Sequence, residues 1–192
     1  FDGYVATEPT VPEYHGYTFV RWYTSDDSVA FDFTTPITEA TTLTALWTAK
    51  PIYEVSFDSM GGSAVAMQNV IEDDMAMEPT DPTQYGFEFE YWYSDDENTP
   101  FDFTTIVTAD IALTAKWTEL TLYTVRFLGV DVPSQDVPEG GMADEPSDPS
   151  KLWHLFDYWY VTDEDVPFDF NDTITANLYL KAKWNVDTNS TL

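Results

Sequence analysis

The chain has 192 residues, of which 17% are aromatic and 43% hydrophobic, so it has enough apolar side chains to bury cores. Its 35 acidic residues against 7 Lys plus Arg give a formal charge of −28, which argues against nucleic acid and anionic membranes as partners because both are recognised largely through Lys and Arg. It contains no cysteine, which excludes disulfides, thiolate zinc sites and thiol nucleophiles.

The predicted strands come in three groups, and the first group lies within residues 1–49. Trp22 lies in one strand, and alternation places Leu43, Ala45 and Trp47 on the inner face of another. No opening strand precedes them in this sequence. We therefore interpret the first group as a partial copy of a longer unit, with its first strand missing.

The second group, residues 50–119, is complete. "YEVSFDS" (53–59) alternates as a strand, "MGG" supplies a turn, and "SAVAMQNVI" can return as the second strand of a hairpin. The next segment, "EPTDPTQYG", has two prolines, which cannot continue a ladder and favour the first turn of a helix. It is predicted to be a short helix or turn that crosses the sheet and ends at Gly86.

The last two predicted strands of the second group are "FEFEYWY" (87–93) and "IALTAKW" (111–117). Strict alternation in the first of these strands places Phe89 on one face and Trp92 on the other. A complete unit is therefore predicted to have about four strands with one short crossover. The third group, residues 120–192, repeats this order from "YTVRFLG" onward and is slightly shorter.

Three landmarks recur at fixed distances in the three groups. Each group has a Trp-Tyr pair, a Phe-Asp-Phe triplet that begins nine positions after that Trp, and another Trp sixteen positions beyond the first Phe. The copies are Trp22, 31–33 and Trp47; Trp92, 101–103 and Trp117; Trp159, 168–170 and Trp184. We interpret them as a tandem repeat, with repeat 1 at 1–49, repeat 2 at 50–119 and repeat 3 at 120–192.

The combined motif resembles the Listeria–Bacteroides repeat, also called the internalin B-repeat. In repeat 2 the resemblance is carried by "FDSMGGSAV", "YGFEFEYWY", "PFDF" and "IVTADIALTAKW". It implies an α+β, β-dominated fold of tandem β-grasp (ubiquitin-like) units, each about four strands with one short helix or turn crossover. It also implies arrays in large secreted or surface-attached microbial proteins, where such repeats act as stalks or interaction modules and not as enzymes.

Acidic loops follow the three Trp-Tyr pairs and are the candidate metal sites. Calcium takes about six to eight oxygen ligands, often from clustered carboxylates and carbonyls, although these loops lack the spacing of an EF-hand. The alternative is a solvated hairpin loop, in which acids favour turns and solubility. The weak calcium candidates are Asp26, Asp27, Asp95, Asp96, Glu97, Asp163, Glu164 and Asp165. No other cofactor is expected.

Catalytic arrangements are not expected. The paired carboxylates of a glycosidase need a buried acid that faces another acid across a cleft, whereas these acids lie in loops of small units. His15 and His154 occupy positions that do not match and are interpreted as ordinary surface or half-buried rings. The sequence has no Gly-rich phosphate loop and no G-x-S-x-G motif.

The Asp at the centre of each Phe-Asp-Phe triplet is predicted to point outward while both Phe rings point inward. We expect its carboxylate to accept hydrogen bonds from the following Thr or from backbone N–H groups, as in an Asx turn.

Exposed Tyr and Trp side chains can stack on sugar rings. The best surface candidates for that role are aromatic residues outside the motif that all three groups share: Tyr14, Tyr91, Trp153 and Tyr158.

The sequence thus predicts a non-enzymatic repeat module of a secreted or cell-surface microbial protein, acting as a stalk or spacer, an adhesive module or an assembly element. The alternative is a carbohydrate- or calcium-dependent adhesin module. The expected partners are a protein or glycan at a cell surface, or copies of the chain, with no membrane insertion within it.

Further expectations concern the ends of the sequence and its sequons. The opening strand that repeat 1 lacks could be donated by a neighbouring chain, which would build a filament. The alternative is that Phe1 is simply where a fragment or proteolytic product begins. Phe1 begins without the pattern of a signal peptide, so an export signal is expected outside this sequence. Asn171 and Asn189 begin sequons that matter only if the host glycosylates.

Overall fold

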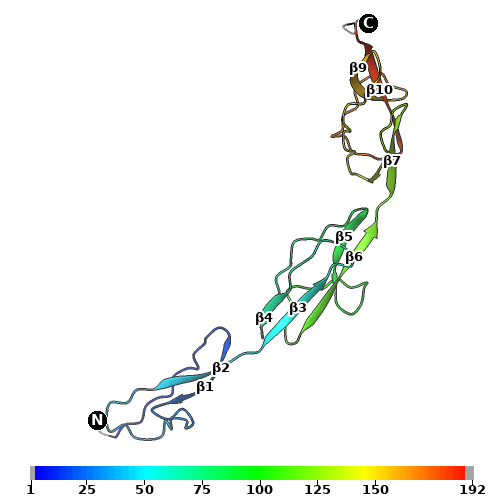
Figure 1. The fold of residues 1–192 in the computed structure, drawn as a ribbon. Coiled ribbons are helices and arrows are strands. Elements are labelled where there is room, and N and C mark those ends of the chain that lie inside the picture. The colour runs from blue at the N-terminus through cyan, green and yellow to red at the C-terminus, as the bar shows by residue number, and fades with distance from the viewer. Residues whose placement is uncertain (1–2, 189–192) are drawn as a thin grey trace. The chain divides into compact units, whose positions relative to one another are not determined.

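The computed structural model describes residues 3–188, which form ten β-strands in three sheets and no helix (Figure 1). Repeat 1 contributes two strands, and repeats 2 and 3 contribute four strands each. The strands are β1 Tyr17–Tyr23, β2 Thr44–Ala49, β3 Ile52–Asp58, β4 Gln68–Ile71, β5 Phe87–Tyr93, β6 Ile111–Glu119, β7 Leu122–Leu128, β8 Gln135–Pro138, β9 His154–Val161 and β10 Leu178–Val186.

The sheets of repeats 2 and 3 have the same topology. Their strand orders are β4-β3-β6-β5 and β8-β7-β10-β9. The central pair of each sheet is parallel, and the short second strand pairs antiparallel with the first. Their registers also correspond, because Phe57 stands opposite Leu113 and Phe127 stands opposite Leu180. Each complete period of the sequence therefore forms one copy of the same mixed sheet.

The crossover was predicted to be a short helix or a turn, and no helix is present in the described residues, so the α+β class is wrong and the units are all-β. A residue that precedes proline is driven out of the helical region, and Pro79 and Pro82 impose this on a short segment. The segment is instead held by a side chain. Gln68 donates through Nε2 to the carbonyl of Met77 at 2.6 Å and accepts from its N–H at 2.8 Å. The implied β-grasp likeness stays a prediction.

Repeat 3 anchors its crossing segment in the same way. Gln135 donates to the carbonyl oxygen of Asp144 at 2.7 Å and accepts from the N–H of Asp144 at 2.8 Å. A glutamine amide presents one donor and one acceptor side by side, so it can imitate one rung of a β-ladder. The crossing segment can therefore stay extended and irregular without leaving these backbone groups unpaired.

The alternation predicted for the strand of the Trp-Tyr pair is also wrong, because a β-bulge interrupts it. In repeat 1 the register shifts between Phe19 and Arg21, and repeat 3 has a shift at the corresponding place. The extra residue brings a Phe and a Trp three positions apart onto one face. The ring centroids of Phe89 and Trp92 are accordingly 5.4 Å apart, and the distances in repeats 1 and 3 are 5.5 and 5.4 Å.

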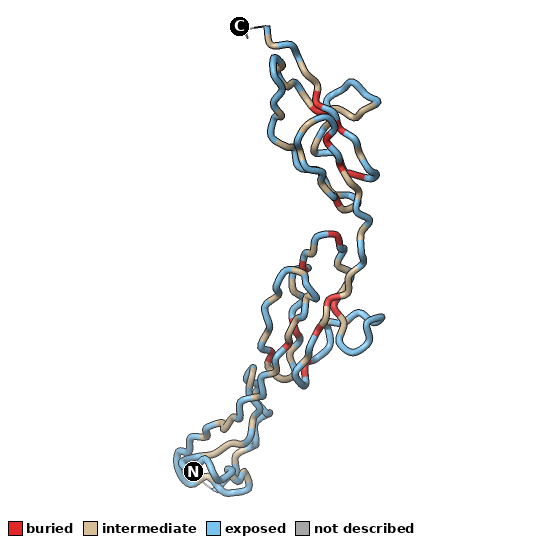
Figure 2. The backbone as a smooth tube through the Cα atoms, turned by 45° about the vertical axis from the view of Figure 1, so that its right-hand side comes forward, coloured by how far each residue is buried: buried red, intermediate tan, exposed pale blue. Residues whose placement is uncertain are grey.

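Equivalent positions are buried in repeats 2 and 3 (Figure 2). Trp92 and Trp159 are each 2% exposed, and Leu113 and Leu180 are 1% and 0% exposed. In repeat 3 the buried cluster also includes Val125 and Ile174, and the Phe rings of the triplet pack against it. Of the recurring landmarks, Trp92 and Trp159 are in the core as predicted, whereas the second landmark Trp of each repeat, Trp117 and Trp184, is only half-buried.

Repeat 1 has the same apolar positions but leaves them partly open. Trp22 and Leu43 are only half-buried, and no residue of 3–49 is buried. Within the described chain β2 pairs only with β1, so no strand lies where β3 lies against β6 in repeat 2. An apolar pocket of about 390 Å³ opens there, and its lining includes Phe31, Ile37 and Leu43. We call these three residues the open face of repeat 1.

The contacts within the chain group it into two compact units, 1–58 with 65–80 and 93–114, and 59–64 with 81–92 and 115–192. The repeat boundaries 1–49, 50–119 and 120–192 stay a prediction from the sequence periods. No helix in residues 3–188 could span a membrane.

Candidate functional site

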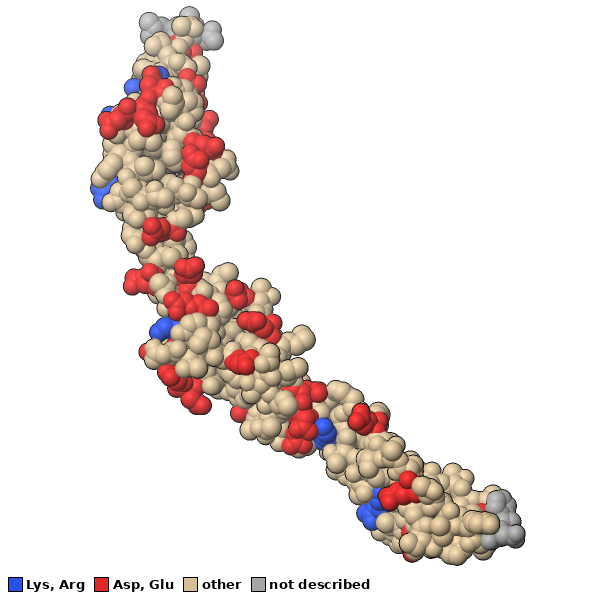
Figure 3. All heavy atoms as spheres, turned by 180° about the vertical axis from the view of Figure 1, so that it is seen from behind, with Lys and Arg blue, Asp and Glu red and all other residues tan. Residues whose placement is uncertain are grey.

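Acidic side chains lie on every repeat, with few basic side chains among them (Figure 3). The three predicted calcium loops connect the strand of the Trp-Tyr pair to the Phe-Asp-Phe triplet, and all eight of their acids are exposed. Burial is one of the causes that raise the pKa of a carboxyl group and make it a general acid, and these exposed side chains lack it. The loops therefore present their charge to the solvent.

The loops of repeats 1 and 2 each use one carboxylate to fold the loop itself. Asp26 accepts from the hydroxyl of Ser28 at 2.6 Å and from its N–H at 2.9 Å. Asp96 accepts from the N–H of Asn98 and from the hydroxyl of Thr99, both at 3.0 Å. These hydrogen bonds favour the charged form and lower the pKa of both carboxyl groups. This geometry is that of a solvated turn.

The loop of repeat 3 uses its last acid in an ion pair. Asp165 accepts from Nζ of Lys183 at 2.6 and 2.8 Å, and the hydroxyl of Tyr158 lies 3.4 Å from the same carboxylate. The hydrogen bond from Lys183 is the main cause that lowers the pKa of Asp165, and it raises the pKa of Lys183. The carboxylate is therefore already neutralised by a partner from β10.

No group of three or more His, Asp or Glu side chains converges on a metal position in the residues that the structure describes. Calcium binding by the acidic loops stays a prediction. If it occurs, millimolar calcium raises the melting temperature above the value in magnesium at equal ionic strength, because a ligand of the folded state stabilises it. Substituting Asp95→Asn together with Glu97→Gln should then reduce the rise by the contribution of the repeat 2 loop. Equal melting temperatures in the two salts would exclude the prediction.

The predicted Asx turns are confirmed. Each central Asp accepts two hydrogen bonds through Oδ1, one from the backbone N–H and one from the side chain of the residue two positions later. The pairs are Asp32 with Thr34 (2.8 and 2.6 Å), Asp102 with Thr104 (2.8 and 2.6 Å) and Asp169 with Asn171 (2.9 and 2.8 Å). Asn171 begins one of the two sequons, and the other, at Asn189, lies outside the described residues.

The Asx turn of repeat 2 predicts a pH-dependent stability. Hydrogen bonds from Thr104 lower the pKa of Asp102 below 3.8, so the turn stabilises the fold above that pH and loses this contribution as the pH falls through the lowered pKa. In urea unfolding, Asp102→Ala should therefore cost stability near neutral pH, and the difference from the unmodified chain should shrink in acid. Asp95→Ala, an exposed loop acid, serves as the control for charge. If the difference in stability between Asp102→Ala and the unmodified chain did not change with pH, the predicted role of the Asp102 carboxylate would be contradicted.

The four predicted surface aromatic residues do not form one platform. Tyr14 and Trp153 are 56% and 45% exposed, whereas Tyr91 and Tyr158 are half-buried. Tyr14 stacks on Tyr17 with ring centroids 4.5 Å apart. The four residues belong to three different repeats, so any sugar site would have to be built within one repeat.

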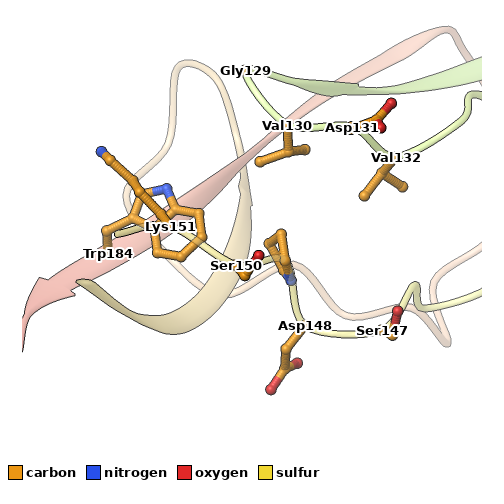
Figure 4. A pocket seen from close by; sticks show the side chains of 10 residues that line it. Gly129, Val130, Asp131, Val132, Ser147, Asp148, Ser150, Lys151 and Trp184 are labelled. Atoms are coloured by element: carbon orange, nitrogen blue, oxygen red, sulfur yellow. The ribbon is translucent and has the colours of Figure 1, made fainter. Parts of the chain in front are cut away.

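A pocket of about 570 Å³ in repeat 3 was missed by the sequence reasoning (Figure 4). It lies between residues 129–132 and 147–151, with Trp184 at one end. Nζ of Lys151 lies 5.6 Å from the centroid of the Trp184 ring. Trp184 had been predicted to be core, and it is in fact half-buried. Two signals were present in the sequence: repeat 3 is shorter before β8, and Lys151 stands where repeat 1 has Tyr14.

The pocket offers groups that suit a ligand, and its serines are not paired with a base. It offers an aromatic ring, an ammonium group and the hydroxyls of Ser147 and Ser150. A nucleophilic serine needs a base within hydrogen-bond reach. Among residues 3–188, neither hydroxyl is hydrogen-bonded to one. The pocket is therefore a candidate ligand site.

Comparison with known proteins identifies three matching segments. Residues 2–46, 53–116 and 123–183 match the Listeria-Bacteroides repeat domain. A protein of Evansella cellulosilytica that is provisionally named a membrane protein is 37% identical over 189 residues, covering 94% of this chain and 28% of that protein. Another, provisionally named a Gly-rich membrane protein, is 35% identical over 195 residues, covering 96% and 22%. The chain thus spans less than a third of either relative. No solved structure matches significantly.

Proposed function

Because the chain belongs to the Listeria-Bacteroides repeat family, we propose that it is a non-enzymatic stalk or spacer module of a secreted or cell-surface microbial protein. The observation that carries the proposal is that repeats 2 and 3 build the same four-stranded sheet around the same core positions. Leu113 and Leu180 are buried at equivalent positions, whereas the acidic loops keep only one residue the same in all three repeats, at Asp26, Asp96 and Asp163. Repetition of one structural unit along a chain is a common way to build an element that sets length.

The proposed location at the cell surface rests on two supports. Both relatives carry names that describe membrane proteins, although those names belong to much longer chains. The charge of −28 also suits an exposed module, because like charges on neighbouring molecules oppose aggregation.

Labelling of cells tests this location. An antibody raised against the chain should label intact cells that produce the full-length protein as strongly as it labels lysed cells. An antibody against a cytoplasmic protein of the same cells should label them only after lysis and so serves as the control. Labelling by the first antibody that appears only after lysis would refute a role at the surface.

Assembly is the second candidate function, and the open face of repeat 1 favours it. In repeat 2, β3 lies beside β6 with Val55 opposite Ile111 and Phe57 opposite Leu113. β2 is the counterpart of β6, and the structure shows no strand beside it on that side within the described residues. An extended segment with the alternation of β3 could add to this edge, because strand addition supplies main-chain hydrogen bonds and covers apolar side chains together.

A further inference from the structure

In repeat 2 the loop between the first two strands closes over the Trp of the last strand. The indole N–H of Trp117 donates to the carbonyl oxygen of Ser59 at 3.0 Å. Gly62 lies so near the ring that a Cβ there would be 2.6 Å from ring carbon Cζ2. The loop is joined to the crossing segment by two hydrogen bonds between Ser63 and Thr83, at 2.8 and 2.9 Å. This position in repeat 2 is therefore filled by the chain itself.

In repeat 3 the corresponding loop is too short to do this. Ten residues separate the Phe of β3 from the Gln that begins β4, but only seven separate Phe127 from Gln135. The strands themselves keep the same register, since Gln68 pairs with Val55 and Gln135 pairs with Val125. The loss of three residues is therefore taken up by the loop alone. The pocket of about 570 Å³ opens where the longer loop lies in repeat 2.

The walls of this pocket combine apolar and polar groups (Figure 4). Val130 and Val132 project from the short loop toward the opposite segment, and Asp148 points away from them. Lys151 lies across Trp184 at the end of the pocket. The volume is within the range of pockets that hold small ligands.

The polar groups of the pocket have unused hydrogen-bonding capacity. Among the residues that the structure describes, the indole N–H of Trp184 has no acceptor, and Nζ of Lys151 has neither an ion pair nor a hydrogen bond. The hydroxyls of Ser147 and Ser150 are likewise not hydrogen-bonded within 3–188. An indole N–H and an ammonium group can only donate, whereas a hydroxyl both donates and accepts. A matching ligand must therefore carry several acceptors.

Strain in the adjacent turn is an independent sign of a functional site. Trp153 has φ of +63°, where repeats 1 and 2 have Gly16 and Gly86 with φ of +79° and +80°. A bulky side chain is unfavourable in this region, and such strain is concentrated at binding sites. The same turn carries Lys151 into the pocket, so repeat 3 keeps an unfavourable residue beside the group that would meet a ligand.

The charges of the chain decide between classes of ligand. The formal charge of −28 opposes an anion. Three charged residues line the pocket, and Lys151, which covers the aromatic ring, opposes a second cation there, whereas the carboxylates of Asp131 and Asp148 point out of the space between the two segments (Figure 4). What remains is a neutral molecule with an apolar face and several hydroxyl groups. A pyranose ring meets both conditions, because its C–H face suits an aromatic ring and its hydroxyls accept and donate.

We propose that this pocket of repeat 3 binds a neutral pyranose sugar. The C–H face of the sugar lies against Trp184 and Val130, and its hydroxyls accept from the indole N–H and from Lys151. Lys151 turns from the ring to the sugar, which is easy because a cation–π contact at an exposed site is weak. The site does not depend on the stalk proposal, since a spacer can carry a ligand site or lack one.

Titration of the full chain with methyl glycosides of glucose, galactose, mannose and N-acetylglucosamine tests the proposal. At least one should bind with a dissociation constant on the order of 1 mM, as expected for a ligand of this size. In NMR spectra the indole N–H signal of Trp184 should shift, and that of Trp117 should stay in place. If none of these sugars moves the Trp184 signal at saturating concentration, the proposal is wrong.

Two variants and a control test whether the sugar binds in the pocket. Lys151→Gln should weaken binding about fivefold, because it removes one charged donor. Grafting residues 58–67 in place of 128–134 should close the pocket and weaken binding at least about tenfold. Lys181→Gln changes an exposed lysine of β10 outside the pocket and should bind as the unmodified chain does.

Two further measurements are needed: whether each variant folds, and whether the pocket prefers neutral sugars to charged ligands. Each variant is compared by thermal unfolding, and Lys151→Gln, whose side chain is exposed, keeps the test valid if the graft does not fold. Unchanged binding in a folded graft, or in Lys151→Gln, would overturn the proposal. Tighter binding of glucuronate or of an alkylammonium ion than of every neutral sugar would also overturn it, because the pocket would then select charge.

Discussion

Leu180→Ala is expected to lower the free energy of unfolding of repeat 3 by about 2–5 kcal/mol. Leu180 is 0% exposed and pairs with Phe127 of β7 on one side and Val161 of β9 on the other. Truncation would leave a cavity between three strands that cannot close without moving the sheet. The matched change Leu43→Ala in repeat 1 should cost only about 1 kcal/mol, because Leu43 is half-exposed in its own repeat.

Hydrogen exchange measured by mass spectrometry distinguishes the two variants within the full chain. Leu180→Ala should accelerate exchange in β10, and Leu43→Ala should change exchange in β2 only slightly. Exchange in β6 is the internal control in both variants. If the two substitutions proved equally costly, repeat 1 would have to be as closely packed as repeat 3, and the open face would not exist in solution.

The second large effect is expected when a hairpin is supplied to repeat 1. A peptide of residues 50–75 should add beside β2 in the register of β3 on β6, which places its Phe57 opposite Leu43. Complete burial of an Ile or Leu side chain stabilises by about 1.5–3 kcal/mol, and the open face has one of each. At saturating peptide, amide exchange in β2 should slow at least about tenfold.

A peptide with Val55→Asp and Phe57→Asp is the matched control, because it keeps the backbone but cannot bury its inner face. It should give no protection, and neither peptide should alter exchange in β10. Equal protection by both peptides would indicate nonspecific association. Absence of protection by the unmodified peptide would remove the assembly candidate.

The aromatic spacing predicted the repeated core correctly, and the reason is physical. Side chains such as Trp92 and Leu113 fill the same space as their counterparts in repeat 3, so their positions cannot drift. The Asx turns were predictable for a similar reason. Asp102 needs only the N–H and hydroxyl of the residue two positions on, so the interaction is local in the sequence.

The features that the sequence did not reveal depend on contacts between distant residues. The side chain of Gln68 makes two hydrogen bonds to the backbone of Met77, which directly precedes the crossing segment, and these bonds help to keep it extended. The residue pattern of the segment itself gives no sign of this distant partner. The β-bulge in β1 breaks an alternation that otherwise looked continuous. The pocket over Trp184 lies where a loop distant in the sequence is three residues shorter than in repeat 2, and the sequence shows the shorter loop but not that it lies beside Trp184.

Single-molecule stretching of the full chain tests the central claim, that the repeats are separate structural units, most directly. We predict two distinct unfolding events for repeats 2 and 3, each releasing roughly 250 Å of contour length, since each repeat holds about 70 residues of up to 3.6 Å. Repeat 1 should open at lower force, because no residue of 3–49 is buried. A single event that releases the whole chain at once, or extension without any resolved event, would contradict the claim.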